Sequence, residues 1–142
     1  MTEPVRASAE ITIDAEPQAV WRVLTDLAQW PDWNPGVTRV NVDGPVAVGT
    51  TFRWKTGPAT IASTITTADA PSSIVWTGRT IGISAVHTWH FDEVQPGRTH
   101  VRSDETWVGM LPRLVPGRAR RMLQNALTQG VEALKERVER GG

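Results

Sequence analysis

The 142-residue sequence contains no cysteine and no tyrosine, and only two of its residues are phenylalanine. Without cysteine the chain has no disulfide, no thiolate chemistry and no cysteine-based zinc site. No apolar run approaches the roughly 20 residues of a membrane span, and the start MTEPVRASAE lacks the basic-then-apolar order of a secretory signal. We therefore expect a cytoplasmic protein with no integral membrane segment.

Several functional motifs are also missing. The chain has no glycine-rich phosphate loop, no nucleophile elbow and no paired aspartate motif, so nucleotide use and metal-dependent hydrolysis are unsupported. His87 and His90 are three residues apart, which places them on opposite faces of a strand. We expect no metal site and no bound cofactor.

Charge is balanced overall but uneven along the chain. Residues 1–110 carry 8 basic and 12 acidic residues, whereas residues 111–142 carry 7 basic and 3 acidic ones. This asymmetry favours a basic helix lying on an acidic sheet, and it is also compatible with a partner surface. We expect no nucleic-acid binding, because a neutral chain lacks a broad basic surface.

The order of elements can be predicted from hydrophobic periodicity. Residues 5–14 alternate as a half-buried strand, and residues 14–30 have helical spacing, after which Pro31 and Pro35 allow only a short second turn of helix. Residues 37–110 form six short runs of period two, separated by glycine and proline turns, which is typical of an antiparallel meander. Residues 117–140 carry one continuous apolar stripe of a long helix. We expect one domain over residues 1–142 and an α+β fold.

The hairpin of residues 87–107 predicts a specific pair. Its odd-numbered residues form the inward face of both strands, so odd residues must lie opposite odd residues. With an odd loop centred on Pro96, the opposing residues are His87 with Glu105, Trp89 with Ser103, and Phe91 with Val101. A loop centre shifted by one residue would move each partner by two.

A carboxylate and an imidazole that face an apolar interior are costly unless they pair. Glu105 would then raise the pKa of His87, and the two groups could hydrogen-bond a polar ligand or act as general acid and base. The alternative is a solvated pair at the edge of the sheet, or a structural hydrogen bond between two strands.

Tryptophan is the dominant aromatic residue, with seven copies. Alternation points Trp54, Trp76, Trp89 and Trp107 toward the interior. Since an indole N–H is buried best where it finds a partner, these side chains line a pocket or, alternatively, form a plain core.

The stretch RLVPGRARR, residues 113–121, contains four arginines and no acid, namely Arg113, Arg118, Arg120 and Arg121. Cations at a helix N-terminus oppose the helix dipole, so helix stability does not explain them. They form either a solvated basic turn or a contact with an anionic surface or a carrier protein.

Three stretches carry a family resemblance: ITIDAEPQAVWRVLTDLAQWPDWNPGV, APSSIVWTG with HTWHF, and GRTHVRSDETWVGML. They resemble the START-like (SRPBCC) superfamily, which includes pollen-allergen-type and polyketide cyclase/dehydrase-like proteins. The resemblance implies a helix-grip fold, in which a seven-stranded curved antiparallel sheet wraps around a long C-terminal helix and two short helices follow the first strand. It also implies an apolar cavity between sheet and helix, with Trp33 near its mouth.

Two functions are compatible with such a scaffold. The first is binding of a small, mostly apolar ligand, lipid-like, polyketide-like or aromatic, without a cofactor. The second is a cyclase/dehydrase-like enzyme in which Glu105 and His87 handle a proton. A third class is a protein-interaction module that uses the arginines of residues 113–121. In each case we expect a monomer or a homodimer. The expected ligand contacts are Trp33, Trp54, Trp76, Trp89, Ser103, Trp107, Leu123 and Leu127.

Overall fold

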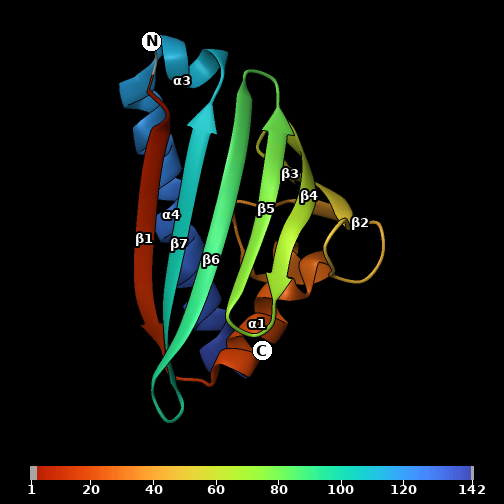
Figure 1. Cartoon of the computed structure of the whole chain (residues 1–142), viewed down its shortest axis with the longest axis vertical. Helices are drawn as coiled ribbons and strands as arrows, with labels where there is room; N and C mark the ends of the chain where they lie inside the picture. Colours follow the sequence, from red (N-terminus) through yellow and green to blue (C-terminus); the bar gives the residue numbers. More distant parts are fainter. Residues whose placement is uncertain (1–2, 142) are drawn as a thin grey trace.

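The computed structural model describes residues 3–141 and contains one seven-stranded antiparallel sheet with a long helix against one face (Figure 1). The strand order is β1-β7-β6-β5-β4-β3-β2. Each strand from β2 to β7 therefore pairs with its sequence neighbour, and β1 joins the far edge beside β7. This confirms the predicted meander. The strands are β1 (Val5–Ile13), β2 (Arg39–Val42), β3 (Thr51–Thr56), β4 (Ala59–Asp69), β5 (Ser73–Thr80), β6 (Ile83–Gln95) and β7 (Arg98–Val108).

The helices cover the ends and one face of this sheet. Between β1 and β2 lie α1 (Pro17–Thr25), the 3₁₀ turn η1 (Leu27–Gln29) and α2 (Trp30–Trp33), and the last helix is α4 (Pro116–Glu139). The sequence also predicts these elements, including the short second helix between the two prolines. The five-residue helix α3 (Met110–Leu114) was not predicted, because it is shorter than two turns and contains a proline.

Helix α4 buries the predicted stripe. Its inward residues recur at spacings of three and four, and α4 packs most extensively on β1. Leu123 and Leu127 form a small core cluster with Val5 and Ala119, whereas the C-terminal half of the helix joins the main core. The buried residues of α4 are Ala119, Leu123, Leu127, Val131, Leu134 and Val138.

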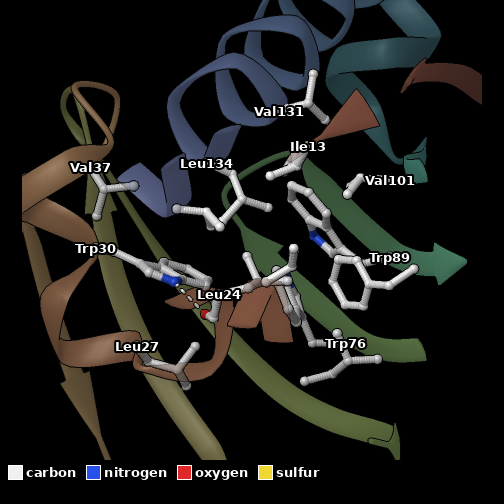
Figure 2. Close-up of a cluster of buried hydrophobic side chains, with 14 of the residues drawn as sticks. Ile13, Leu24, Leu27, Trp30, Val37, Trp76, Trp89, Val101, Val131 and Leu134 are labelled. Atoms are coloured by element: carbon white, nitrogen blue, oxygen red, sulfur yellow. Dashed lines mark hydrogen bonds between the residues drawn. The ribbon is translucent and has the colours of Figure 1, made fainter. Parts of the chain in front are cut away.

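The main core contains the segment that looks least like core in the sequence. Trp30, at the start of α2, is buried, and its indole N–H donates to the carbonyl oxygen of Leu24 at 2.8 Å (Figure 2). Its ring lies 5.7 Å from Phe52 and 5.4 Å from Trp76, measured between ring centroids. The proline-rich turn therefore carries its tryptophan inward, onto the sheet.

The β6–β7 hairpin has the predicted register with a different turn. His87 lies opposite Glu105, Trp89 opposite Ser103 and Phe91 opposite Val101, which confirms the predicted pairs. The connection is not a simple odd loop centred on Pro96, however. Pro96 and Gly97 form a two-residue turn between Gln95 and Arg98, and the register shifts between Glu93 and Gln95. Such a bulge supplies the extra residue that keeps odd positions facing odd positions.

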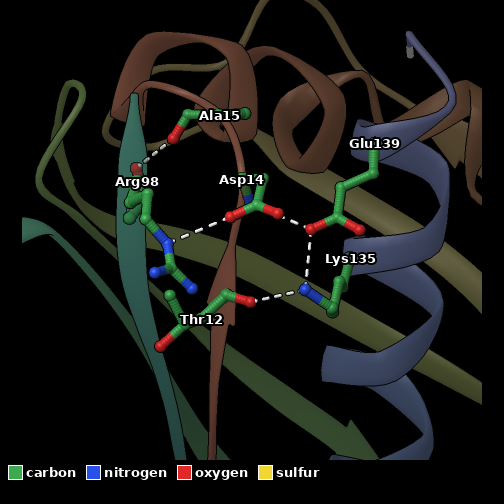
Figure 3. A network of polar contacts seen from close by, with 7 residues as sticks. Thr12, Asp14, Ala15, Arg98, Lys135 and Glu139 are labelled. Carbon is green, nitrogen blue, oxygen red and sulfur yellow. Dashed lines mark hydrogen bonds and ion pairs between the residues drawn. The ribbon is translucent and has the colours of Figure 1, made fainter. Parts of the chain in front are cut away.

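A polar network fixes the last turns of α4 to the end of β1 (Figure 3). Glu139 accepts a hydrogen bond from the backbone N–H of Asp14 at 2.9 Å, and it pairs with Lys135 at 2.7 Å. The ammonium of Lys135 also donates to the carbonyl oxygen of Thr12 at 2.7 Å. These contacts position the helix along the sheet.

In the described part of the chain, no helix combines the length and the apolar character that crossing a membrane requires.

Candidate functional site

The candidate site is built on the inward faces of β6 and β7. His87 and Glu105 are opposite each other in the ladder, and the Nδ1 atom of His87 lies 3.1 Å from Oε1 of Glu105. Their side chains are 14% and 16% exposed, so neither is a solvated surface group. The contact that alternation predicts is therefore formed by partly enclosed side chains.

Two further residues of β7 extend this pair into a chain of four hydrogen-bonded side chains. The second ring nitrogen of His87, Nε2, lies 2.6 Å from the hydroxyl of Ser103, and the indole N–H of Trp107 donates to Oε2 of Glu105 at 2.6 Å. We call Ser103, His87, Glu105 and Trp107 the polar chain. Since an indole N–H can only donate, Oε2 is always an acceptor. This leaves Oε1 as the favoured place for a proton on Glu105, facing the imidazole.

Burial dominates the electrostatics of the polar chain. Desolvation raises the pKa of Glu105 to about 7, against a smaller lowering from the Trp107 hydrogen bond. Desolvation also lowers the pKa of His87 to about 3. The expectation that the pKa of His87 is raised is therefore wrong, because burial disfavours the imidazolium and Glu105 is protonated and uncharged at the pH where His87 would titrate. Near neutral pH the imidazole is neutral and Glu105 exchanges a proton.

The tryptophans of β5 and β6 pack against one another and against His87 of the polar chain. Trp76 and Trp89 are buried, with ring centroids 6.5 Å apart, and the imidazole of His87 lies 5.1 Å from Trp76 and 5.2 Å from Trp89. Trp30 completes this cluster, although it was not among the expected ligand contacts. Its signal in the sequence is its size, because a tryptophan in a proline-rich turn needs cover from the sheet or from a ligand. Within residues 3–141, the buried indole N–H of Trp89 has no hydrogen-bond partner.

Trp54 and Trp107 occupy a more open position. Both are half-buried, and the indole N–H of Trp54 donates to the buried hydroxyl of Ser63 at 3.1 Å. Trp107 packs against the core cluster that contains Leu123 and Leu127. These two tryptophans flank the inward face near the end of the sheet where β7 leads into α3.

Trp33 is partly buried and packs against the main core. It also lines a cavity of about 330 Å³ between α1, η1 and the end of α4, together with Arg22, Asp26, Gln29 and Arg137. The lining of this cavity includes no strand residue, so the place of Trp33 at the mouth of a cavity between sheet and α4 stays a prediction. Among the described residues, its indole N–H also lacks a hydrogen-bond partner.

The other charged candidates lie on the surface. His90 is exposed while His87 faces inward, and residues 3–141 contain no group of three or more histidine, aspartate or glutamate side chains placed to hold a metal. Arg113, Arg118, Arg120 and Arg121 are all exposed. No ion pair in the described chain involves any of the four or joins α4 to the sheet.

The comparisons with known proteins agree with this architecture. A START superfamily protein from Mycobacterium smegmatis matches with a TM-score of 0.83 and 15% identity, over 95% of this chain and 97% of that one. The Zhui aromatase/cyclase from Streptomyces sp. R1128 matches with a TM-score of 0.83 and 18% identity, over 97% and 95%. Norcoclaurine synthase from Thalictrum flavum, solved with dopamine and hydroxybenzaldehyde, matches with a TM-score of 0.77 and 15% identity, over 99% of this chain and 89% of that one.

Identities this low show a shared fold alone. The search of curated proteins returned no significant match. A family model described as polyketide cyclase/dehydrase and lipid transport, however, matches residues 4–139, nearly the whole chain. The chain therefore belongs to this START-like family of polyketide cyclases, dehydrases and lipid transporters.

Proposed function

We propose that the protein binds a small, mostly apolar molecule beside the polar chain, on the inward face of the sheet. The observation that carries this proposal is the polar chain itself, because its four hydrogen-bonded side chains project inward from a face made largely of aromatic and aliphatic residues. Ligand sites typically combine an apolar lining with a few polar groups that orient the ligand. The family description includes lipid transport, which is the same class of ligand.

The half-buried tryptophans indicate where such a ligand would lie. Trp54 and Trp107 are partly accessible, whereas Trp76 and Trp89 are 3% and 4% exposed and packed on other rings. We therefore place the apolar part of the ligand against Trp54 and Trp107, with Leu123 and Leu127 behind them. Trp76 and Trp89 form the floor, and the free indole N–H of Trp89 is a donor for a ligand oxygen.

The polar chain can present either a donor or an acceptor at Ser103. When Glu105 is protonated, its proton faces Nδ1, so Nε2 carries the imidazole proton and donates to Ser103. When Glu105 is ionised, Nδ1 carries the proton and Nε2 accepts from the serine hydroxyl. The protonation state of Glu105 thus sets the hydrogen-bonding role of Ser103.

An enzyme on the same scaffold is the second candidate, and the raised pKa of Glu105 is the observation that favours it. A carboxyl group with a pKa of about 7 is present in both protonation states at neutral pH, as a general acid or base requires. In this role Glu105 takes a proton from a carbon next to a carbonyl group, and His87 orients the carboxylate. The aromatase/cyclase and norcoclaurine synthase share the fold, so the scaffold supports enzymes as well as carriers.

Tryptophan fluorescence tests the binding site. We expect a neutral apolar probe, N-phenyl-1-naphthylamine, to quench the protein, and the double variant Trp54→Phe/Trp107→Phe to lose most of that quenching. Trp33→Phe is the matched control, since it removes one indole from the separate helical cavity and should leave the quenching in place. No quenching at all, or quenching abolished by Trp33→Phe, would contradict the proposed site.

Hydrogen exchange at carbon separates carrier from enzyme. If Glu105 acts as a base, the protein should accelerate exchange of the hydrogens between the two carbonyls of a β-diketone with deuterated water, and Glu105→Gln should abolish this while still binding the apolar probe. Asp104→Asn changes the neighbouring carboxylate on the outer face and should have no effect. If the parent, Glu105→Gln and Asp104→Asn all gave the same exchange rate, the catalytic function would be excluded and the carrier function would remain.

A further inference from the structure

The direction of the strands gathers basic residues at one end of the molecule. In the meander, the β3–β4 turn, the β5–β6 turn and the connection from β7 to α4 lie at the same end, the top in Figure 1. The three segments concerned, residues 53–60, 79–84 and 108–122, contain no acidic residue, and Glu3 ahead of β1 is the acid at this end. Their basic residues are Arg53, Lys55, Arg79, Arg113, Arg118, Arg120 and Arg121.

The opposite end has the opposite charge. There the chain passes from β1 to α1, from β2 to β3, from β4 to β5 and from β6 to β7. Arg98 is the one basic residue of these four connections, taken as residues 13–17, 42–51, 69–73 and 91–98. Their acidic residues are Asp14, Glu16, Asp43, Asp69, Asp92 and Glu93. The end of α4 also lies here, and its residues 132–140 add three acidic and three basic side chains, so the balance stays acidic. The two ends of the molecule therefore carry opposite charge.

Large apolar side chains project from the basic end. Ile81, in the β5–β6 turn, is 98% exposed, Leu114 is 70% exposed and Met110 is 59% exposed. We call these three residues, together with Arg113, Arg118, Arg120 and Arg121, the arginine tip. Residues this exposed gain nothing from burial in the fold, and their clustering beside cations indicates an interaction surface.

The backbone holds α3 firmly against the β5–β6 turn. The N–H of Leu111 donates to the carbonyl oxygen of Gly82 at 3.0 Å. Gly109 has a φ of 123°, and a Cβ at this position would lie 2.5 Å from the same oxygen. A side chain at residue 109 would separate the two segments, so glycine is required there. Ile81 and the exposed residues of α3 consequently belong to one surface.

We propose that the arginine tip docks this end of the molecule onto an anionic lipid bilayer. Arginine side chains bind anionic headgroups while the protruding apolar side chains enter the boundary between headgroups and acyl chains. The four arginines have no ion pair within residues 3–141, so they are available to such a surface. This docking does not depend on which ligand the interior binds.

The shape of the tip favours a bilayer over an acidic carrier protein. A protein partner requires a matching groove for each projecting side chain, whereas a bilayer accepts them without one. Neither the cavity beside Trp33 nor the trough of about 850 Å³ that crosses the outer face of the sheet includes a residue of the tip. We therefore take the bilayer, which needs no groove on either side, as the partner of the tip.

Vesicle flotation of the full chain tests the proposal. We expect the protein to float with vesicles of equal parts phosphatidylcholine and phosphatidylglycerol, to stay in solution with pure phosphatidylcholine, and to dissociate at high salt. Arg118→Gln/Arg121→Gln should weaken binding about 25-fold, at about five-fold for each arginine. Ile81→Ser/Leu114→Ser should weaken it about ten-fold without changing the charge.

Matched variants at the other end keep the test specific. Arg22→Gln/Arg137→Gln removes the same charge near α1, and Val48→Ser/Val94→Ser removes two exposed apolar side chains from the β2–β3 and β6–β7 connections. Both should bind vesicles like the parent protein. Absence of binding to anionic vesicles would overturn the proposal. The proposal would also be overturned if tip and control variants weakened vesicle binding equally. It would be overturned as well if the tip variants bound vesicles normally and lost affinity only for an acidic helical protein.

Discussion

At the scale of single residues, the polar chain places a titrating carboxyl group inside the fold. Glu105 is accepted there because Trp107 and His87 occupy its two oxygens, but its charged form still loses hydration. The same burial keeps His87 neutral. One proton, shared between Oε1 and Nδ1, therefore dominates how this part of the molecule responds to pH.

This arrangement predicts a loss of stability, dependent on Glu105, as the pH rises from 4.5 to about 7. Its pKa is about 7 in the fold against an ordinary value of 4.5, so its contribution to stability is complete below pH 4.5 and is lost as the pH rises through 7. Relative to Glu105→Gln, the parent protein should lose about 3 kcal/mol of unfolding free energy over this range. Urea unfolding of both proteins across the range measures the difference.

Asp104→Asn is the control for that measurement, since its carboxylate is on the outer face and pairs with Arg102. A free-energy difference between parent and Glu105→Gln that stays constant with pH would show that Glu105 titrates as it does in water.

Alternation alone located His87 and Glu105, because facing residues in a hairpin must share a side of the sheet. It did not locate the contacts of Trp107 with Glu105 and of His87 with Ser103, which depend on side-chain rotamers within and between the strands. Nor could it give the sign of the pKa shift of His87, since that depends on how completely α4 and the tryptophans exclude water. Trp30 was left out of the expected contacts because flanking prolines indicate a surface turn, although its size requires cover there.

At the scale of elements, the attachment of α4 to β1 depends on one carboxylate near the helix end. Hydrogen bonds from the Asp14 N–H and Lys135 lower the pKa of Glu139, so its contribution is present above the ordinary pKa and is lost as the pH falls through the lowered one. We expect Glu139→Gln to cost about 0.5 kcal/mol, the usual size for an exposed pair, and to speed amide exchange at Asp14.

Glu136→Gln provides the comparison for this prediction. It removes an equal charge from the same helix, but the ion pair of Glu136 with Arg140 is internal to the helix end and does not reach the strand. Amide exchange by NMR should therefore change at Asp14 in one variant only. If both variants behaved alike at Asp14, the link between helix and strand would have no energetic weight.

Elements with long, regular patterns were predictable and short ones were not. The stripe of α4 extends over 24 residues and the strands alternate cleanly, so both were identified from periodicity. Helix α3 has five residues, and the β6–β7 turn reaches its register through a bulge beside Val94. A pattern shorter than two turns, or one extra residue in a ladder, leaves no periodic signal.

At the scale of the whole molecule, the fold turns an uneven distribution of charge along the chain into a difference between two ends. The sequence showed an excess of basic residues in the last 32 residues, and it was compatible with neutralisation by the sheet or with a partner surface. The strand directions favour the partner surface. They bring Arg53, Lys55 and Arg79 to the same end as the four arginines of the tip, so the charges accumulate.

This polarity predicts how the molecule is oriented when it is bound to anionic vesicles. Backbone amides of the β5–β6 turn and of residues 109–116 should exchange more slowly with vesicles present, because contact with the headgroups restricts their access to water and their local opening. The β2–β3 and β6–β7 connections, at the acidic end, should exchange at the same rate with and without vesicles, which makes them an internal reference in one hydrogen-exchange mass spectrometry experiment. Protection at both ends, or at the acidic end alone, would mean that charge segregation does not orient the molecule.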